Sequence, residues 1–339
     1  METKTEIKKA CFDDLDFFMG QNYAPFRDAV VSALTPIKKN EYAEKLKAFL
    51  LELSGGNKAF LFSSAEEAYF WTLKSVKSGV DNSIVKNRNE IIVLSQDIYD
   101  FIVPDIAAGA ETVKRVQVDH VGNFISALSD KTCAVIVELF SAAGEEIYKK
   151  DFLKQISEIC AVRNIAFIID ERKSFPMFTG ELFAFTSYGI RPDAVIIGGN
   201  IYRAFSFGAV ITGKKFKASQ YKKEVGCAVC AGAFSLFTGA FNLKDAVVGR
   251  GTRLYDLLTI CKKVKTCRLC GLKGYADVAD GKKVAAELKE KGLKVGATDN
   301  RIIFNVPIGI SEEEFEFGLN IIKDVLKGAL NPFDTDKTE

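Results

Sequence analysis

Two short runs of apolar residues near the middle of the chain carry the strongest structural signal. Residues 165–169 and 194–197 are continuously apolar, are too short for helices, and end abruptly in polar residues or glycine. Such runs are typical of strands buried in a parallel sheet, where functional groups gather at the carboxyl ends. Asp170 and Glu171 follow the first run, and a buried carboxylate there requires a compensating partner. The pattern therefore predicts a parallel sheet with a site beside Asp170.

Other segments of the chain show the periodicities of further strands and helices. Leu46, Phe49, Leu50 and Leu53 recur at the spacing of an amphipathic helix. The further expected strands are residues 60–62, 90–94 and 133–139. The expected helices are residues 42–53, 64–74, 151–160 and 243–261.

The composition indicates a globular protein without a nucleic-acid or membrane partner. The 339 residues are 48% hydrophobic, which is enough for a large core and more than one domain. The 46 basic and 44 acidic residues give a net charge of +2 and are dispersed, so no nucleic acid is expected. The sequence has no basic and apolar leader and no apolar run long enough to cross a bilayer. We therefore expect a cytoplasmic protein.

The residues that commonly bind zinc, cysteine and histidine, are few and scattered. Eight cysteines in a chain of this length, without a signal peptide, are expected to be reduced thiols. Cys227 and Cys230, like Cys267 and Cys270, have a spacing that zinc sites use. The second pair falls in an expected strand, where residues three apart point to opposite faces. We expect packing cysteines and no metal site, with zinc as the alternative, and a surface position for His120.

A specific order of motifs runs through the central stretch. Asp170-Glu171 is followed by Thr-Gly-Glu-Leu-Phe-Ala at 179–184, Tyr-Gly-Ile-Arg-Pro-Asp at 188–193 and Phe-Gly-Ala at 207–209. In this order and register the segments resemble the class III aminotransferases, which are fold-type-I enzymes that use pyridoxal phosphate. The acetylornithine aminotransferases are the most similar branch of that family.

The resemblance covers nearly all of the chain after residue 45 and implies its fold. It implies an α/β protein with a mostly parallel central sheet, helices on both faces, and a small α+β carboxyl-terminal domain. We expect an N-terminal arm over residues 1–45, a large cofactor-type domain over 46–240, and a linking helix with the small domain over 241–335. Members of the family are homodimers with sites at the interface, so a homodimer is expected here. The expected elements of the small domain are a strand over 267–277, a helix over 284–291, a strand over 301–307 and a capped helix over 311–326.

One position departs sharply from the family pattern. In the family, the strand after Pro-Asp ends on the lysine that forms a Schiff base with the cofactor. Counted without gaps from Asp193 and back from Gly208, that position is Gly199, and residues 193–207 contain no lysine. The resemblance therefore implies a member that lacks the usual catalytic lysine.

The segments that would hold the cofactor phosphate and ring are partly altered. Ser64, Ala65 and Glu66 lie where amides at a helix N-terminus hold the phosphate in the family. Glu66 would bring a carboxylate toward that phosphate. Alternatively, Ser64 caps the helix and Glu66 favours its dipole. Tyr99 is the candidate for the aromatic residue that stacks on the ring, and Glu138 matches a family glutamate.

The residues at the end of the central strand also have family counterparts. Asp170 matches the aspartate that pairs with the pyridine nitrogen and keeps the ring an electron sink. Arg172 replaces an aliphatic residue on the ring face, and Lys173 replaces a glutamine near the ring hydroxyl. Both are either cofactor contacts or cations paired with Asp170 and Glu171.

Two further binding positions are changed. Ile303 stands where the family has the arginine that clamps the substrate carboxylate, and Arg301, on the same face of the strand, is the candidate to replace it. Residues 227–233 stand where a loop reaches the phosphate of the partner subunit, with Ala233 in place of a threonine. A small amino-acid-like ligand is the expected ligand class.

Three functions remain open from the sequence. The first is a member of this family that no longer transaminates and acts as a binding, regulatory or partner protein. The second is an active enzyme that uses pyridoxal or pyridoxamine phosphate with an atypical base such as Lys173, because one lysine normally performs all the proton transfers. The third is a thiol or metal-binding protein on the same fold.

Overall fold

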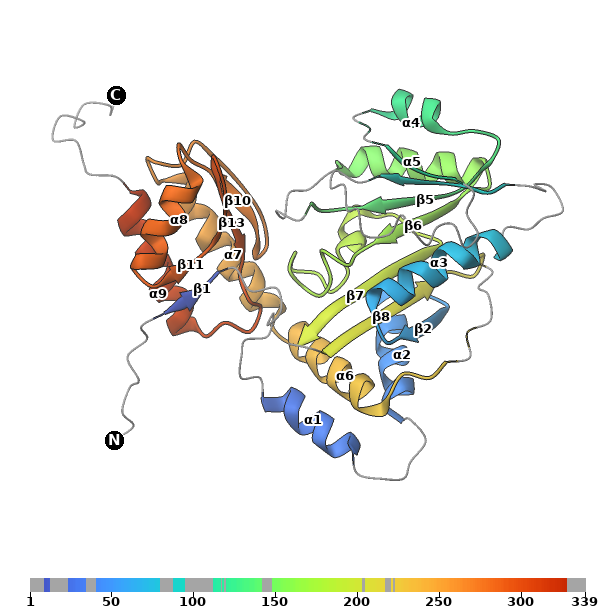
Figure 1. Cartoon of the computed structure of the whole chain (residues 1–339), viewed down its shortest axis with the longest axis horizontal. Coiled ribbons are helices and arrows are strands. Elements are labelled where there is room, and N and C mark those ends of the chain that lie inside the picture. Colours follow the sequence, from blue (N-terminus) through green and yellow to red (C-terminus); the bar gives the residue numbers. More distant parts are fainter. Residues whose placement is uncertain are drawn as a thin grey trace.

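Two domains make up the described part of the chain. The computed structural model describes residues 9–12, 24–34, 41–79, 88–94, 112–116, 118, 120–141, 148–202, 205–216, 221 and 223–327. A seven-stranded sheet forms the larger domain and a four-stranded sheet the smaller one (Figure 1). Helix α7 (Lys244–Thr259) runs from the first toward the second. The expected α/β fold, with a mostly parallel sheet and a small α+β domain, is confirmed.

The large sheet has the strand order β2-β8-β7-β6-β5-β3-β4. Strands β4, β3, β5, β6 and β7 pair in parallel, whereas β8 is antiparallel to both β7 and β2. Glu138 at the end of β5 lies in register with Asp170 at the end of β6. Both carboxylates therefore stand at the same edge of the sheet. The strands are β2 (Lys58–Phe62), β3 (Glu90–Leu94), β4 (Thr112–Val116), β5 (Thr132–Glu138), β6 (Ala166–Asp170), β7 (Ala194–Tyr202) and β8 (Phe205–Thr212).

Helices cover both faces of this sheet. Ile168 packs in one apolar cluster with Tyr69 of α3, and Ile169 packs in the other with Leu153 of α5 and Leu236 of α6. The two neighbours face opposite ways because strand side chains alternate. The helices of this domain are α1 (Ala24–Leu34), α2 (Glu41–Ser54), α3 (Ala65–Gly79), α4 (Val121–Ala127), α5 (Lys150–Val162) and α6 (Cys227–Phe241).

The small domain is an antiparallel sheet packed with helices α8 and α9. Its strand order is β12-β13-β10-β9. Strand β1 (Ala10–Cys11), in the expected N-terminal arm, pairs in parallel with β11 (Leu293–Lys294), which places these two residues of the arm on the small domain. The remaining elements are β9 (Thr266–Cys270), β10 (Lys273–Asp277), α8 (Gly281–Glu290), β12 (Gly296–Thr298), β13 (Arg301–Asn305) and α9 (Glu312–Leu326).

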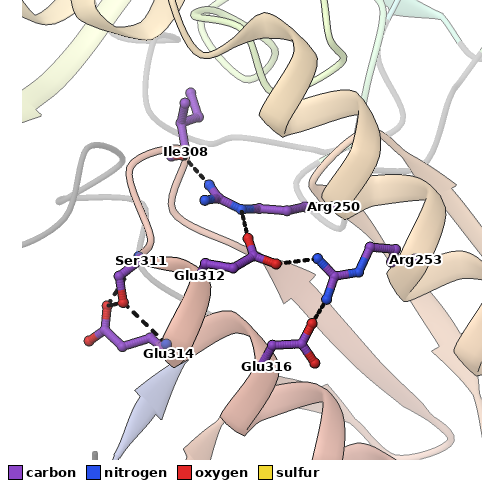
Figure 2. A network of polar contacts seen from close by, with 7 residues as sticks. All are labelled: Arg250, Arg253, Ile308, Ser311, Glu312, Glu314 and Glu316. Atoms are coloured by element: carbon purple, nitrogen blue, oxygen red, sulfur yellow. Dashed lines mark hydrogen bonds and ion pairs between the residues drawn. The ribbon is translucent and has the colours of Figure 1, made fainter. Parts of the chain in front are cut away.

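A polar network fixes α9 to the linking helix α7 (Figure 2). Arg250 donates from Nε to Glu312 at 3.3 Å and from Nη1 to the carbonyl of Ile308 at 3.3 Å. Arg253 bridges Glu312 and Glu316. Ser311 forms the predicted capping box with Glu314 at the start of α9. The contacts hold the small domain on the helix that leads to the large one.

Two local expectations are wrong. Residues 267–277 do not form one strand but a hairpin, β9 and β10, whose turn contains Gly271 at φ +58°. Glycine adopts this left-handed conformation without a steric penalty, and the backbone folds back there. Residues 227–233 are not a loop but the first turns of α6. Cys230, Ala231 and Ala233 are buried against the core, and residues 227–229 are partly buried.

Candidate functional site

The carboxylate of Asp170, at the end of β6, is held by Arg172 two residues further on. Arg172 Nε lies 2.9 Å from Oδ1 and 3.0 Å from Oδ2, and Nη2 lies 2.6 Å from Oδ2. The backbone N–H of Arg172 also donates to Oδ1, at 3.1 Å. The side chain of Asp170 is only 3% exposed. Its two oxygens are therefore engaged by a bidentate, charge-assisted contact within the chain itself.

Tyr69, which sequence reasoning did not single out, completes this arrangement. The guanidinium carbon of Arg172 lies 4.5 Å from the centroid of the buried Tyr69 ring. Burial works to lower the pKa of Arg172, but Asp170 more than offsets this, and the net pKa is raised. Tyr69 lies one turn into α3, on the face toward the sheet. The helical periodicity of the sequence could have identified it by this position.

Lys173 pairs with a different carboxylate from the one expected. Its Nζ lies 3.0 Å from Oε2 of Glu138, not beside Glu171. The parallel register that sets Glu138 opposite Asp170 explains the partner, because Lys173 follows β6 and reaches the end of β5. Both carboxylates at this edge of the sheet thus carry a counter-charge from the same short segment.

Glu171 is satisfied by backbone amides rather than by a cation. Its Oε2 accepts from Ala184 N at 2.9 Å and its Oε1 from Phe185 N at 2.5 Å. These amides begin the 3-10 helix η3 (Ala184–Tyr188), where N–H groups have no partner within the helix. Complete burial, reinforced by Asp170, raises the pKa of Glu171 to about 8, although the two amides act in the opposite direction. Glu171 is therefore a structural carboxyl.

The start of α3 is built as an ordinary capped helix. The hydroxyl of Ser64 accepts from the backbone N–H of Glu67 at 3.1 Å, which confirms Ser64 as the N-cap. Ala65 is buried and Glu66 is exposed. Glu67 pairs with Lys223 at 2.9 Å. Acidic residues in this first turn favour the helix dipole.

Gly199 lies in β7 beside open space. Its φ is +144°, a conformation that L residues rarely adopt, and a Cβ built there would meet no atom within 4 Å. The neighbouring Gly198 has φ +128°. A side chain at position 199 would therefore have room but would strain the backbone.

The other predicted residues lie apart from this cluster or outside the described part. Arg301 Nε lies 2.7 Å from Oδ1 of Asp277, and its guanidinium carbon lies 3.5 Å from the centroid of the Tyr275 ring. These contacts hold Arg301 on the small-domain sheet. Tyr99 falls outside the described residues. His120 caps α4 and is exposed, as expected, with Nδ1 accepting from Asn123 N at 3.3 Å.

Lys273 of β10 is a buried lysine beside the same segment, and sequence reasoning missed it. Its Nζ donates to the backbone carbonyl of Lys173 and lies 4.5 Å from the centroid of the Phe178 ring. The residue is 4% exposed. Burial, with a smaller contribution from the charge of Lys173, lowers the pKa of Lys273 to about 7. Lys273 is the first residue of β10, whose sequence is Lys-Gly-Tyr-Ala-Asp, and no local pattern predicted its burial.

We expect the free energy of unfolding to rise with pH because of the buried amine of Lys273. The amine of the unfolded chain keeps its proton up to about pH 10.5, whereas the folded amine loses it near 7. Between these values the unfolded state binds more protons, so raising the pH favours folding. Lys273→Met removes this titration. Between pH 7 and 9.5 the Tm of wild type should therefore rise relative to the Tm of Lys273→Met. Lys282→Met, at an exposed site of α8, is the control, and parallel pH profiles for wild type and Lys273→Met would contradict the assignment.

The described residues contain no group of three or more His, Cys, Asp or Glu side chains placed to hold a metal ion. Cys230 is buried, and Cys227, Cys267 and Cys270 are partly buried free thiols. Among the described helices none is alone long and apolar enough to cross a bilayer. Helices α6 and α7, bent by 59°, meet that criterion only as a pair.

Comparison with known proteins gives a consistent result. The family described as Aminotransferase class-III matches residues 93–326. Acetylornithine aminotransferase of Methanocaldococcus jannaschii is 24% identical over 309 residues, 83% of this chain and 77% of the relative. The protein of the same name from Clostridium acetobutylicum is 26% identical over 316 residues, 85% of this chain and 82% of the relative.

Solved structures agree with this fold. Acetylornithine aminotransferase from Elizabethkingia anophelis superimposes with a TM-score of 0.79 at 20% identity, covering 94% of this chain and 89% of the other. Ornithine aminotransferase from Toxoplasma gondii ME49 gives 0.77 at 19% identity, with coverage of 92% and 84%. At this level of identity the solved structures support only the fold. The family assignment rests on the sequence match over residues 93–326. The chain belongs to the class-III aminotransferase family, whose members depend on pyridoxal phosphate.

Proposed function

We propose that this chain does not carry out the amino transfer of its family and acts instead as a binding or partner protein on the aminotransferase fold. The observation that carries the proposal is the contact of Arg172 with Asp170. A protonated pyridine nitrogen would have to donate to this carboxylate, and both oxygens of Asp170 already accept from Arg172, which competes for them.

Two further features support the loss of amino transfer. Position 199 provides no amine, and the glycine there has a backbone conformation that a lysine rarely adopts. Amino transfer in this family relies on one lysine both for covalent attachment and for proton transfer. The described residues therefore match the donor and acceptor needs of the cofactor poorly.

The alternative is an enzyme that uses Lys173 as its base. The position of Lys173 after β6 favours it, because the amine lies at the correct edge of the sheet. The ion pair with Glu138 opposes it, because a neighbouring carboxylate favours the ammonium form, which cannot accept a proton. Lys173 is better explained as the counter-charge of Glu138.

Two properties of the family extend to this chain as proposals. We propose a homodimer and a small amino-acid-like ligand. Arg301 remains the proposed carboxylate contact, although its present partners are Asp277 and Tyr275.

An amino-transfer assay tests the proposal. Purified protein with added pyridoxal phosphate, N-acetylornithine and a 2-oxo acid is expected to form no new amino acid. The matched variant Arg172→Val frees Asp170 and is expected to bind pyridoxal phosphate more tightly than wild type in equilibrium dialysis. Arg172→Lys, which keeps a cation near Asp170, should bind less than Arg172→Val. Turnover by the wild-type protein above a heat-inactivated sample would rule the proposal out.

A further inference from the structure

A hollow lies at the end of the large sheet opposite the Asp170 edge. Its volume is about 430 Å³, within the range of small-molecule sites. The lining includes Ala166, where β6 begins, and Asp193, just before β7. Asp170 ends β6, so the whole length of that strand separates the hollow from the candidate site. The hollow is a separate feature of the fold.

Basic side chains dominate the charge of this hollow. Arg191, Lys214 and Lys215 line it, against one carboxylate, Asp193. Within the described part of the chain, the side chains of Arg191 and Lys214 make no hydrogen bond or ion pair, and both are exposed. Two unpaired cations therefore remain for a ligand.

The single carboxylate is already engaged. Asp193 Oδ2 accepts from the backbone N–H of Phe167 at 2.9 Å. Burial raises the pKa of Asp193, while that amide and the charge of Lys215 act to lower it. The repulsion that Asp193 would exert on an anion is thus reduced by partners within the protein.

The carboxyl end of α5 also faces this region, and the guanidinium of Arg88 offsets the partial negative charge of that helix end. Arg88 Nη1 donates to the carbonyl of Arg163 at 2.9 Å and to that of Asn164 at 3.3 Å. The remaining wall is mixed, with the apolar side chains of Val76, Ile165 and Phe216. Such a wall suits an organic body attached to an anionic group.

We propose that this hollow binds a small phosphate ester, with the phosphate between Arg191 and Lys214 and the organic part along the apolar wall. A phosphate carries close to two negative charges and several strong acceptors, which matches two unpaired cations. The volume exceeds that needed for the phosphate alone, which favours an ester over the free ion. The proposal goes beyond the function proposed above and does not depend on it, because neither Asp170 nor Gly199 takes part.

Calorimetric titration of the full-length protein tests the site. The ligands are glycerol 3-phosphate, glycerol, inorganic phosphate and succinate. Glycerol 3-phosphate is expected to bind most tightly, inorganic phosphate more weakly, and glycerol not at all. The double variant Arg191→Gln/Lys214→Gln should lose about ten-fold or more in affinity for glycerol 3-phosphate.

The control variant Lys289→Gln/Lys291→Gln also removes two positive charges, at the end of α8. It should bind glycerol 3-phosphate as tightly as wild type. Both replaced pairs are exposed, so the fold should persist. Equal affinity of wild type and the Arg191 and Lys214 double variant would overturn the site. Tighter binding of succinate or of inorganic phosphate than of glycerol 3-phosphate would overturn the ligand class.

Discussion

Arg172→Ala is expected to lower the free energy of unfolding by about 3–5 kcal/mol. The change leaves the carboxylate of Asp170, 3% exposed, without its counter-charge. It also removes the cation from the Tyr69 ring. Chemical denaturation followed by the fluorescence of Trp71 measures this, because Trp71 is the only tryptophan and is buried against Phe60 and Phe62 in the same domain.

Arg253→Ala is the matched control for this prediction. Arg253 also contacts two carboxylates, Glu312 and Glu316, but its side chain is 40% exposed (Figure 2). Exposed pairs contribute less than about 1 kcal/mol. Adding Asp170→Asn to Arg172→Ala should recover part of the loss, because the unpaired charge is then gone. If Arg172→Ala costs no more than Arg253→Ala, Arg172 does not neutralise a buried charge.

Glu171→Ala is expected to cost about 2–4 kcal/mol. The backbone amides of Ala184 and Phe185 lose their only acceptor in the described structure and stay buried. The start of η3, at the last residue of the Thr-Gly-Glu-Leu-Phe-Ala segment, should then loosen. Hydrogen exchange at these two amides gives a local measurement, with faster exchange expected in the variant than in wild type.

Glu171→Gln removes the charge and keeps one of the two hydrogen bonds. Its single acceptor oxygen can serve one amide, its NH2 group cannot accept from the other, and the side chain cannot ionise. The carboxyl of the unfolded chain loses its proton near pH 4.5 and the folded one near 8, so between these values the folded state binds more protons. Wild type should therefore lose stability relative to Glu171→Gln as pH rises through this window. Identical profiles for the two proteins, or unchanged amide exchange in Glu171→Ala, would contradict the structural role.

The parts of the fold that the sequence predicted are those set by local patterns. The apolar run before Asp170 became β6 because a strand buried on both faces needs apolar residues at every position. Ser64 and Ser311 cap their helices as predicted, since capping involves only residues within one turn. The pairing of Arg172 with Asp170 was among the alternatives because the two are neighbours along the chain.

The parts that were missed depend on register and tertiary contact. Lys173 pairs with Glu138 because parallel pairing brings the end of β5 beside it, and strand order cannot be read from a single strand. Glu171 finds backbone amides thirteen and fourteen residues away rather than a cation. Lys273 reaches the same segment from the other domain. Each of these partners is distant in sequence, so composition and periodicity contain no signal for the contact.

The most direct test of the lost amino transfer is the visible spectrum of the purified protein with pyridoxal phosphate, before and after borohydride reduction. A lysine-linked cofactor absorbs in the visible range, and reduction fixes it to that lysine, where peptide mass analysis locates it. Because Gly199 supplies no amine and Arg172 engages Asp170, we expect no such band and no modified lysine. A band that reduction fixes on one lysine, whether Lys173, Lys273 or another, would contradict the account and identify the group that replaces the missing lysine.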